Sequence, residues 1–180
     1  MSIQPQAVLD FWRAAGEQRW FTRDPAFDAE CEARFLDAHY AAAWREFEHW
    51  MDGAPGALAL LILLDQIPRN VFRNSAHAYA TDPLARYYAR RAIEAGFDKS
   101  VEPDLRTFFY LPFEHSEDLA DQERALALYR ALPTANADRW AVIHYNIIRR
   151  FGRFPHRNAA LGRQTTPEEQ AFLDSGGFAG

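Results

Sequence analysis

Hydrophobic side chains recur at spacings of three and four along most of the chain, which is the pattern of helices with one buried face. The clearest series lies between Ala137 and Phe151. Its members fall at i, i+3, i+4, i+7, i+8 and i+11, and are Trp140, Ile143, His144, Ile147, Ile148 and Phe151. This spacing predicts a helix over that segment, with His144 on its apolar side.

A second segment is hydrophobic on every side rather than on one. From Leu58 to Leu64, apolar residues cover the circumference of the expected helix, so this helix should be buried on most sides and lie at the centre of the fold. Pro55 fits its first turn, and Pro68 is expected to end it. The composition from Asn70 to Thr81 predicts a loop.

Capping signals mark where other helices begin and end. A proline follows an acidic N-cap residue at Asp24 and again at Asp82, and Ser116 precedes two acidic residues. Thr166 and Glu169 have the spacing of a capping box, in which each side chain bonds the other residue's main-chain N–H. The residues expected to end helices are Gly16, Gly53, Gly96, Pro133 and Gly176.

These segments together predict an all-α fold. About eight helices fit the pattern, and no strand signal matches them in strength. One helix is expected to carry Trp44, Phe47 and Met51 on a single face. Short loops between the helices favour stacked antiparallel helix pairs, within a single domain over residues 1–180.

Composition and charge exclude several classes of protein. Twenty Lys and Arg residues against 25 Asp and Glu residues give a net charge of -5, which argues against nucleic acid or an anionic membrane as partner. Cys31 is the single cysteine, so neither an internal disulfide nor a multi-cysteine zinc site can form. The longest apolar run is too short to span a bilayer, and the first residues lack the features of a signal peptide. We therefore expect a cytoplasmic protein.

Polar residues gather in three segments where the apolar pattern does not explain them: Asp65–Arg73, Tyr110–Asp118 and His144–Asn158. Five arginines and no acidic residue lie between His144 and Arg163, whereas five acidic residues lie between Glu114 and Glu123. In one interpretation, the two blocks pair with each other and fix the packing of helices. In another, they share a cleft. A third, a nucleic-acid surface at Arg150–Phe154, conflicts with the acidic net charge.

The cleft interpretation assigns a role to each residue. Arg153 and Arg157 would bind a small anionic ligand, while Glu114 and His115 would form a titratable pair able to act as general base in a hydrolase-like reaction. Asp65 would orient an arginine. The remaining ligand-binding candidates are Arg69, Asn70, His144, His156 and Asn158. Neither a metal nor a cofactor is predicted, since the chain carries no zinc-binding or phosphate-binding motif.

Simpler structural roles compete with this assignment. His144 fits a buried histidine with one hydrogen-bond partner, and Arg69 and Arg157 fit capping roles at helix ends. The competing function is a helical-repeat scaffold that binds a peptide or protein partner, with the charged cluster purely structural. Its binding groove should be lined by aromatic and aliphatic side chains.

Four strings also resemble a known family. They are LDQIPRN at Leu64–Asn70, YATDPL at Tyr79–Leu84, YLPFEHSEDLADQ at Tyr110–Gln122 and RFGRFPHRNAALG at Arg150–Gly162. They resemble a bacterial family known as domain of unknown function 924, and the resemblance extends over nearly the whole chain. It implies an all-helical, tetratricopeptide-like α-α superhelix. It supplies no activity, cofactor or catalytic residue, so the function stays open.

Overall fold

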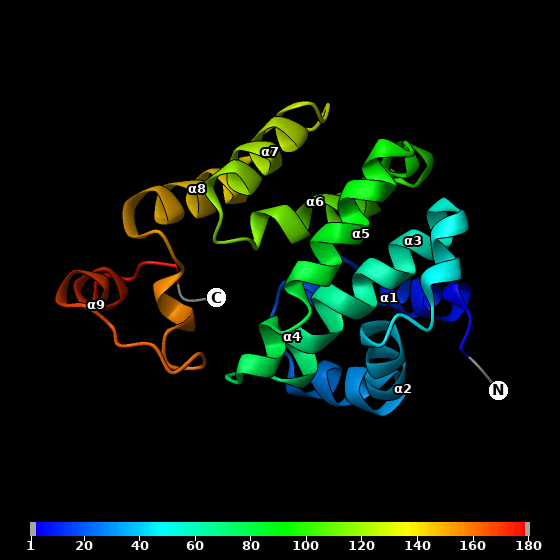
Figure 1. Cartoon of the computed structure of the whole chain (residues 1–180), viewed down its shortest axis with the longest axis horizontal. Coiled ribbons are helices and arrows are strands. Elements are labelled where there is room, and N and C mark those ends of the chain that lie inside the picture. Colours follow the sequence, from blue (N-terminus) through cyan, green and yellow to red (C-terminus); the bar gives the residue numbers. More distant parts are fainter. Residues whose placement is uncertain (1–2, 179–180) are drawn as a thin grey trace. The chain divides into compact units, whose positions relative to one another are not determined.

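The structure is a computed structural model that describes residues 3–178. Within that range the chain forms helices and no strand, which confirms the all-α prediction (Figure 1). The helix from Ala54 to Val71 changes type along its length, and when it is counted once the described residues form eight helices, as expected. The tetratricopeptide-like arrangement stays a prediction.

The chain divides into two compact units. Among the described residues, the first unit comprises residues 3–73 and 77–112, and the second comprises residues 74–76 and 113–178. The boundary falls inside helix α6 (Thr107–Glu114), directly after Pro112. The single domain expected from the sequence stays a prediction. No helix in residues 3–178 combines the length and the apolar character needed to cross a membrane.

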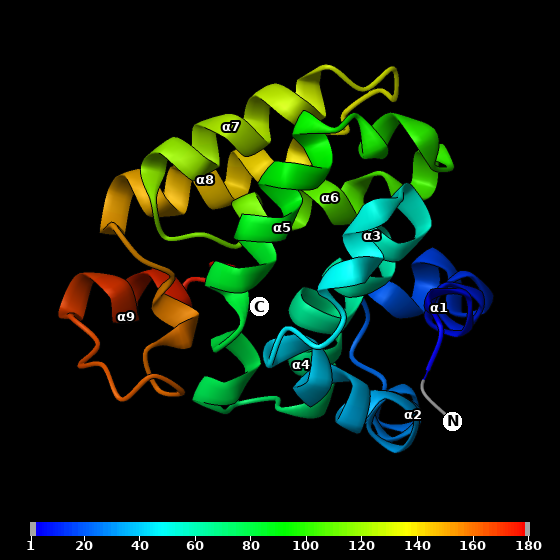
Figure 2. The ribbon, with the colours of Figure 1, turned by 45° about the vertical axis from the view of Figure 1, so that its right-hand side comes forward.

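The first unit is built around α3 (Ala54–Leu61), as the sequence predicts. Every residue from Ala57 to Leu64 is fully buried. Figure 2 shows α1 (Pro5–Trp20) and α5 (Asp82–Glu94) packed against α3. The unit also contains α2 (Pro25–Ala43) and α4 (Ile67–Val71), which pack against each other. Burial on all sides matches the apolar sequence from Ala57 to Leu64.

A π-helical turn at Ile62–Gln66 joins α3 to α4, so the helix continues past Pro68 instead of ending there. Pro68 has no N–H to donate to Leu64 O, and its ring would crowd that carbonyl in a regular helix. The wider turn accommodates the ring, and Thr81 Oγ1 donates to Leu64 O at 2.5 Å. His39 Nδ1 lies 2.9 Å from the preceding carbonyl, Leu63 O. Side chains therefore replace the hydrogen bonds that the turn loses.

The helix expected to carry Trp44, Phe47 and Met51 does not form. The reason is Arg45, which takes a left-handed φ of 65° and ends α2. Its N–H donates to Ala42 O at 3.0 Å, which closes the last turn. A 3-10 segment, Glu48–Asp52, follows and contains Met51.

Three other predicted boundaries also shift. Gly16 has a φ of 68° and breaks the axis of α1, but helical turns resume as far as Trp20. Thr81, not Asp82, is the N-cap of α5. Asp118, not Ser116, caps α7 (Leu119–Arg130), because its carboxylate accepts from two main-chain N–H groups of the first turn. In contrast, the N-cap at Asp24 and the Thr166–Glu169 capping box form as predicted.

The second unit contains the helical pair α7 and α8 (Arg139–Phe151), which run antiparallel along each other (Figures 1 and 2). A 3-10 turn at Pro155–Arg157 and helix α9 (Pro167–Asp174) follow. Ile147 and Ile148 of α8 form a buried cluster with Phe154. This cluster is part of the hydrophobic core of the second unit.

Candidate functional site

The ten predicted site residues divide between the two units. Asp65, Arg69 and Asn70 lie in the first unit. The second unit contains Glu114, His115, His144, Arg153, His156, Arg157 and Asn158. The single cleft predicted from the sequence, which requires residues from both units, stays a prediction.

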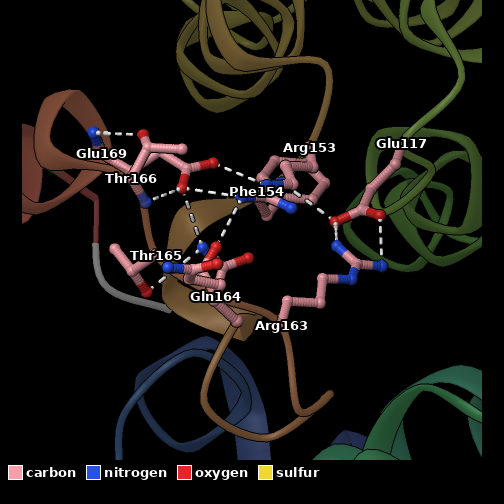
Figure 3. A network of polar contacts seen from close by, with 9 residues as sticks. Glu117, Arg153, Phe154, Arg163, Gln164, Thr165, Thr166 and Glu169 are labelled. Carbon is pink, nitrogen blue, oxygen red and sulfur yellow. Dashed lines mark hydrogen bonds and ion pairs between the residues drawn. The ribbon is translucent and has the colours of Figure 1, made fainter.

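Arg153 is held in the second unit by Glu169, a residue at the first turn of α9 (Figure 3). Arg153 donates from Nε at 2.6 Å and from Nη2 at 2.9 Å to the two carboxylate oxygens. Asn158 Nδ2 and the Thr166 N–H donate to the same carboxylate at 3.1 and 2.8 Å. The hydrogen bond from Arg153, above all, lowers the pKa of Glu169 to about 2. Glu169 is only 3% exposed, so it anchors α9 from inside the unit.

A second arginine–carboxylate pair joins Glu117 to Arg163 (Figure 3). Arg163 donates from Nη1 and Nη2 at 2.9 and 2.8 Å, and the Phe154 N–H donates to the same side chain at 2.9 Å. Burial opposes ionisation of Glu117, but these donors outweigh it and hold its pKa below the ordinary range. The acidic and basic blocks of the sequence therefore do pair with each other here.

The Glu114 carboxylate pairs with His144, a residue of α8. Glu114 Oε1 lies 2.9 Å from His144 Nδ1, and both side chains are almost fully buried. Trp140 O lies 2.8 Å from the same nitrogen. Two acceptors around Nδ1 assign it the proton, so this nitrogen acts as donor. The His115 ring lies beside His144, with centroids 6.4 Å apart.

Arg157 and His156 pack on Phe154. The Arg157 guanidinium carbon lies 4.3 Å from the Phe154 ring centroid, and Nη1 donates to His115 O at 3.0 Å. Arg157 is 5% exposed, which places its charge inside the unit rather than on a ligand-accessible wall. The His156 ring lies 5.6 Å from that of Phe154. This arrangement fits a structural role for Arg157, for which the sequence suggested a helix cap.

In the first unit, Asp65 and Arg69 are part of a network around the π-helical turn. Arg69 donates to both oxygens of Asp82 at 2.9 Å and lies 3.2 Å from Asp65. Asn70 Oδ1 accepts from Arg73, which also binds the Asp28 carboxylate with two hydrogen bonds. Asp65 therefore contacts an arginine, and its role at a ligand site stays a prediction. Each arginine in this network binds a carboxylate of the chain itself.

An open groove between α8 and α9 is a feature of the second unit that the sequence does not reveal. Its volume is about 650 Å³. Trp140 stands at its edge, 54% exposed, although its spacing places it on the apolar stripe of α8. The lining residues are Trp140, Ile143, Asn146, Ile147, Arg150, Phe151, Phe172, Gly176, Gly177 and Phe178. The apolar face of α8 is wider than one helix–helix interface needs, which could have suggested a groove. The spacing of its residues does not show which of them stay exposed.

The groove differs from the ionic clusters in chemistry. Its walls are mainly aromatic and aliphatic, with Asn146 and Arg150 as the polar side chains. Within residues 3–178, no group of three or more His, Cys, Asp or Glu side chains is arranged to hold a metal ion. The second unit thus combines a charge-paired interior with an uncovered apolar surface.

Comparison with known proteins identifies the family. A sequence model of a family described as bacterial protein of unknown function (DUF924) matches residues 8–177. The chain belongs to this family. A search of the curated proteins found no match. The solved structure of a protein of unknown function from Agrobacterium tumefaciens shares 53% sequence identity and superposes with a TM-score of 0.92, over 95% of this chain and 97% of that chain. Family membership therefore supports the helical fold and assigns no activity.

Proposed function

We propose that this protein is a helical interaction module, and that the groove between α8 and α9 binds an amphipathic helix of a partner protein. The observation that carries the proposal is the groove itself, an uncovered apolar surface with a half-exposed tryptophan at its edge. Amphipathic helices commonly bind such grooves through side chains spaced three and four residues apart. The sequence suggested a scaffold that binds a peptide or protein partner as the competing function, and such a scaffold needs a groove lined by aromatic and aliphatic side chains.

Trp140 is the expected anchor of the interaction. Tryptophan is enriched among the interface residues whose truncation costs most binding energy, because it covers a large area when buried. Its neighbours Ile143 and Phe151 are partly buried and continue the apolar surface along α8. Since α8 has 13 residues, it offers about 20 Å of length, enough for a few turns of a partner helix.

The charges beside the groove indicate the chemistry of the partner. Arg139, Arg149 and Arg150 are exposed on α8, and no acidic residue lies in that helix. Arg150 pairs with Glu168 at 3.0 Å, but both side chains are more than half exposed, so the pair contributes little and can be exchanged for a partner's carboxylate. A helix with acidic residues flanking its apolar face would complement this surface.

The ionic clusters give weaker support to the alternative, a cleft for a small anion. Arg153 and Arg163 each donate two hydrogen bonds to a carboxylate of the same unit. At Arg153, an anionic ligand would have to displace the Glu169 carboxylate, which is 3% exposed, and leave it buried without its partner, which costs several kcal/mol. The charged residues therefore fit the structural role better than the ligand-binding role.

A displayed library of amphipathic peptides, each about 16 residues long, tests the proposal by selection against the whole chain. We expect enriched sequences with aromatic and aliphatic residues at helical spacing and acidic residues on the flanks. Trp140→Ala should weaken their binding by about 2 kcal/mol, which is about 30-fold in Kd by isothermal titration calorimetry.

Trp44→Ala is the matched control, because Trp44 is the more exposed of the two side chains, at 75% against 54%, and lies in the first unit. Its removal should leave binding unchanged. The proposal fails if selection enriches no such family of peptides, or if the two tryptophan variants weaken binding equally.

A further inference from the structure

The segment after α9 turns back toward α8 through two glycines. Gly176 has a φ of 81°, a left-handed conformation that glycine adopts without strain. At Gly177 a Cβ atom would lie 2.6 Å from the Phe172 ring and from Phe172 O, closer than real contacts allow. Only a residue without a side chain fits this turn. The sequence Gly176–Gly177 is thus what allows Phe178 to reach the groove.

Phe178 is one of the residues that line the groove, and its ring packs against the imidazoles of His144 and His156. We call the place between these two imidazoles the inner end of the groove. The Phe178 centroid is 4.5 Å from that of His144 and 5.2 Å from that of His156, in edge-to-face geometry at both. The Trp140 centroid lies 6.3 Å away. These separations are in the range in which aromatic pairs attract beyond simple burial. The inner end of the groove is therefore shaped around one aromatic ring.

We propose that this inner end is a binding subsite for a single aromatic side chain of the partner, and that Phe178 occupies it when no partner is bound. This inference rests on the proposed function of the groove. It identifies the partner helix more closely: its apolar face carries a Phe, Tyr or Trp that replaces Phe178 between His144 and His156.

Two features make Phe178 replaceable. Its ring is only partly buried, whereas Phe154 on the same cluster is fully buried. Its connection to α9 consists of two glycines, which can adopt many other conformations once the ring leaves. A partner's aromatic residue would gain the contacts that Phe178 loses, so binding becomes a competition between the two rings.

Removing the internal occupant should open the subsite to a small aromatic probe. We choose N-acetyl-phenylalaninamide, followed by NMR of the imidazole protons of His144 and His156. If Phe178 fills the subsite more than about nine-tenths of the time, Phe178→Ala strengthens the apparent affinity for the probe at least about tenfold. N-acetyl-leucinamide is the control probe and should bind more weakly.

A second variant keeps the ring but displaces the segment. Gly177→Ala introduces the Cβ that collides with Phe172, so Phe178 should leave the subsite and the probe should again bind more tightly than to the unmodified chain. Phe21→Ala, which truncates an exposed phenylalanine of the first unit, is the matched control and should change nothing. The inference is overturned if neither Phe178→Ala nor Gly177→Ala strengthens probe binding, or if the leucine probe binds as well.

The outcome also separates this inference from the proposed function. If selected peptides bind the chain while Phe178→Ala changes neither peptide nor probe affinity, the groove is a docking site and the aromatic subsite is refuted. If the probe enters the emptied subsite but no peptide binds any variant, the subsite stands and the partner helix is refuted.

Discussion

Replacing Glu169 by glutamine removes the charge that four donors of the second unit share. The glutamine keeps the size of the side chain and one oxygen, which can still accept from the Thr166 N–H as glutamine does in a capping box. Its amide nitrogen carries no charge and cannot accept from Arg153 Nε, so the change breaks the ion pair with Arg153. We expect α9 to lose its attachment first, since this ion pair fixes its first turn.

The magnitude follows from the pKa of Glu169, which falls from 4.5 to about 2. Each pKa unit corresponds to about 1.4 kcal/mol, and because Arg153 is 29% exposed, solvent screening leaves about 2 to 3 kcal/mol of the full difference. The folded-state pKa is the lower one, so this stabilisation is complete above about pH 4.5 and disappears as the pH falls toward 2. At neutral pH the melting temperature should drop by roughly 5 to 10 °C.

Thermal and urea unfolding of Glu169→Gln, followed by circular dichroism between pH 7 and pH 2.5, measures this contribution. The difference from the unmodified chain should be largest at pH 7 and fall to roughly a quarter of that value at pH 2.5, because the folded-state pKa lies near 2. Glu168→Gln is the control, because Glu168 is 65% exposed and should contribute less than about 0.5 kcal/mol. Equal effects of the two substitutions, or a difference that does not change with pH, would refute the reasoning.

Three further predictions concern the first unit. Gly56→Ala places a Cβ 2.2 Å from the carbonyl oxygen of Trp50 and should cost more than about 2 kcal/mol by urea unfolding. Gly53→Ala, whose Cβ would make only an ordinary contact at 4.0 Å with the Pro55 ring, should cost less. Burial lowers the pKa of His39 below 6.5, although a hydrogen bond to a main-chain carbonyl opposes this shift, so the free energy of unfolding should fall as the pH drops below 6.5. His39→Asn should flatten this pH dependence. An unchanged pH profile in the variant would contradict the prediction. Burial also raises the pKa of the Cys31 thiol to about 12, so a disulfide reagent at pH 8 should label it only on unfolding; prompt labelling of the folded chain contradicts this.

The sequence predicted correctly those features whose contacts lie between residues a few positions apart. The α8 helix follows from a period of three and four residues, and the capping box follows from two side chains three residues apart. Asp24 likewise caps α2 through N–H groups two and three residues away. In each case the deciding contacts lie within one turn of the chain, so a single sequence contains them.

Contacts that depend on tertiary packing could not be predicted in the same way. Glu117 binds Arg163 across 46 residues, and no sequence spacing selects that arginine among the others. Pro68 was expected to end a helix, but burial on every side keeps the helix intact and the π-helical turn absorbs the proline. Trp140 has the spacing of a core residue, yet only the position of α9 determines that it stays exposed.

The hydrogen bonds between arginines and carboxylates indicate where a partner can bind. A guanidinium binds a carboxylate or phosphate best through two parallel N–H donors. When both donors already bind a carboxylate of the chain, they are not available to a ligand. Within the described residues, six arginines are held by two hydrogen bonds each to acids of their own unit: Arg13 by Glu102, Arg45 by Glu48, Arg69 by Asp82, Arg73 by Asp28, Arg153 by Glu169 and Arg163 by Glu117. A free anion competes poorly with a carboxylate attached to the same chain, since the folded chain holds that carboxylate at high effective concentration. Recognition is therefore expected at the apolar groove of α8 and α9, where binding removes hydrophobic surface from water, breaks an exposed ion pair and displaces the partly buried Phe178 ring.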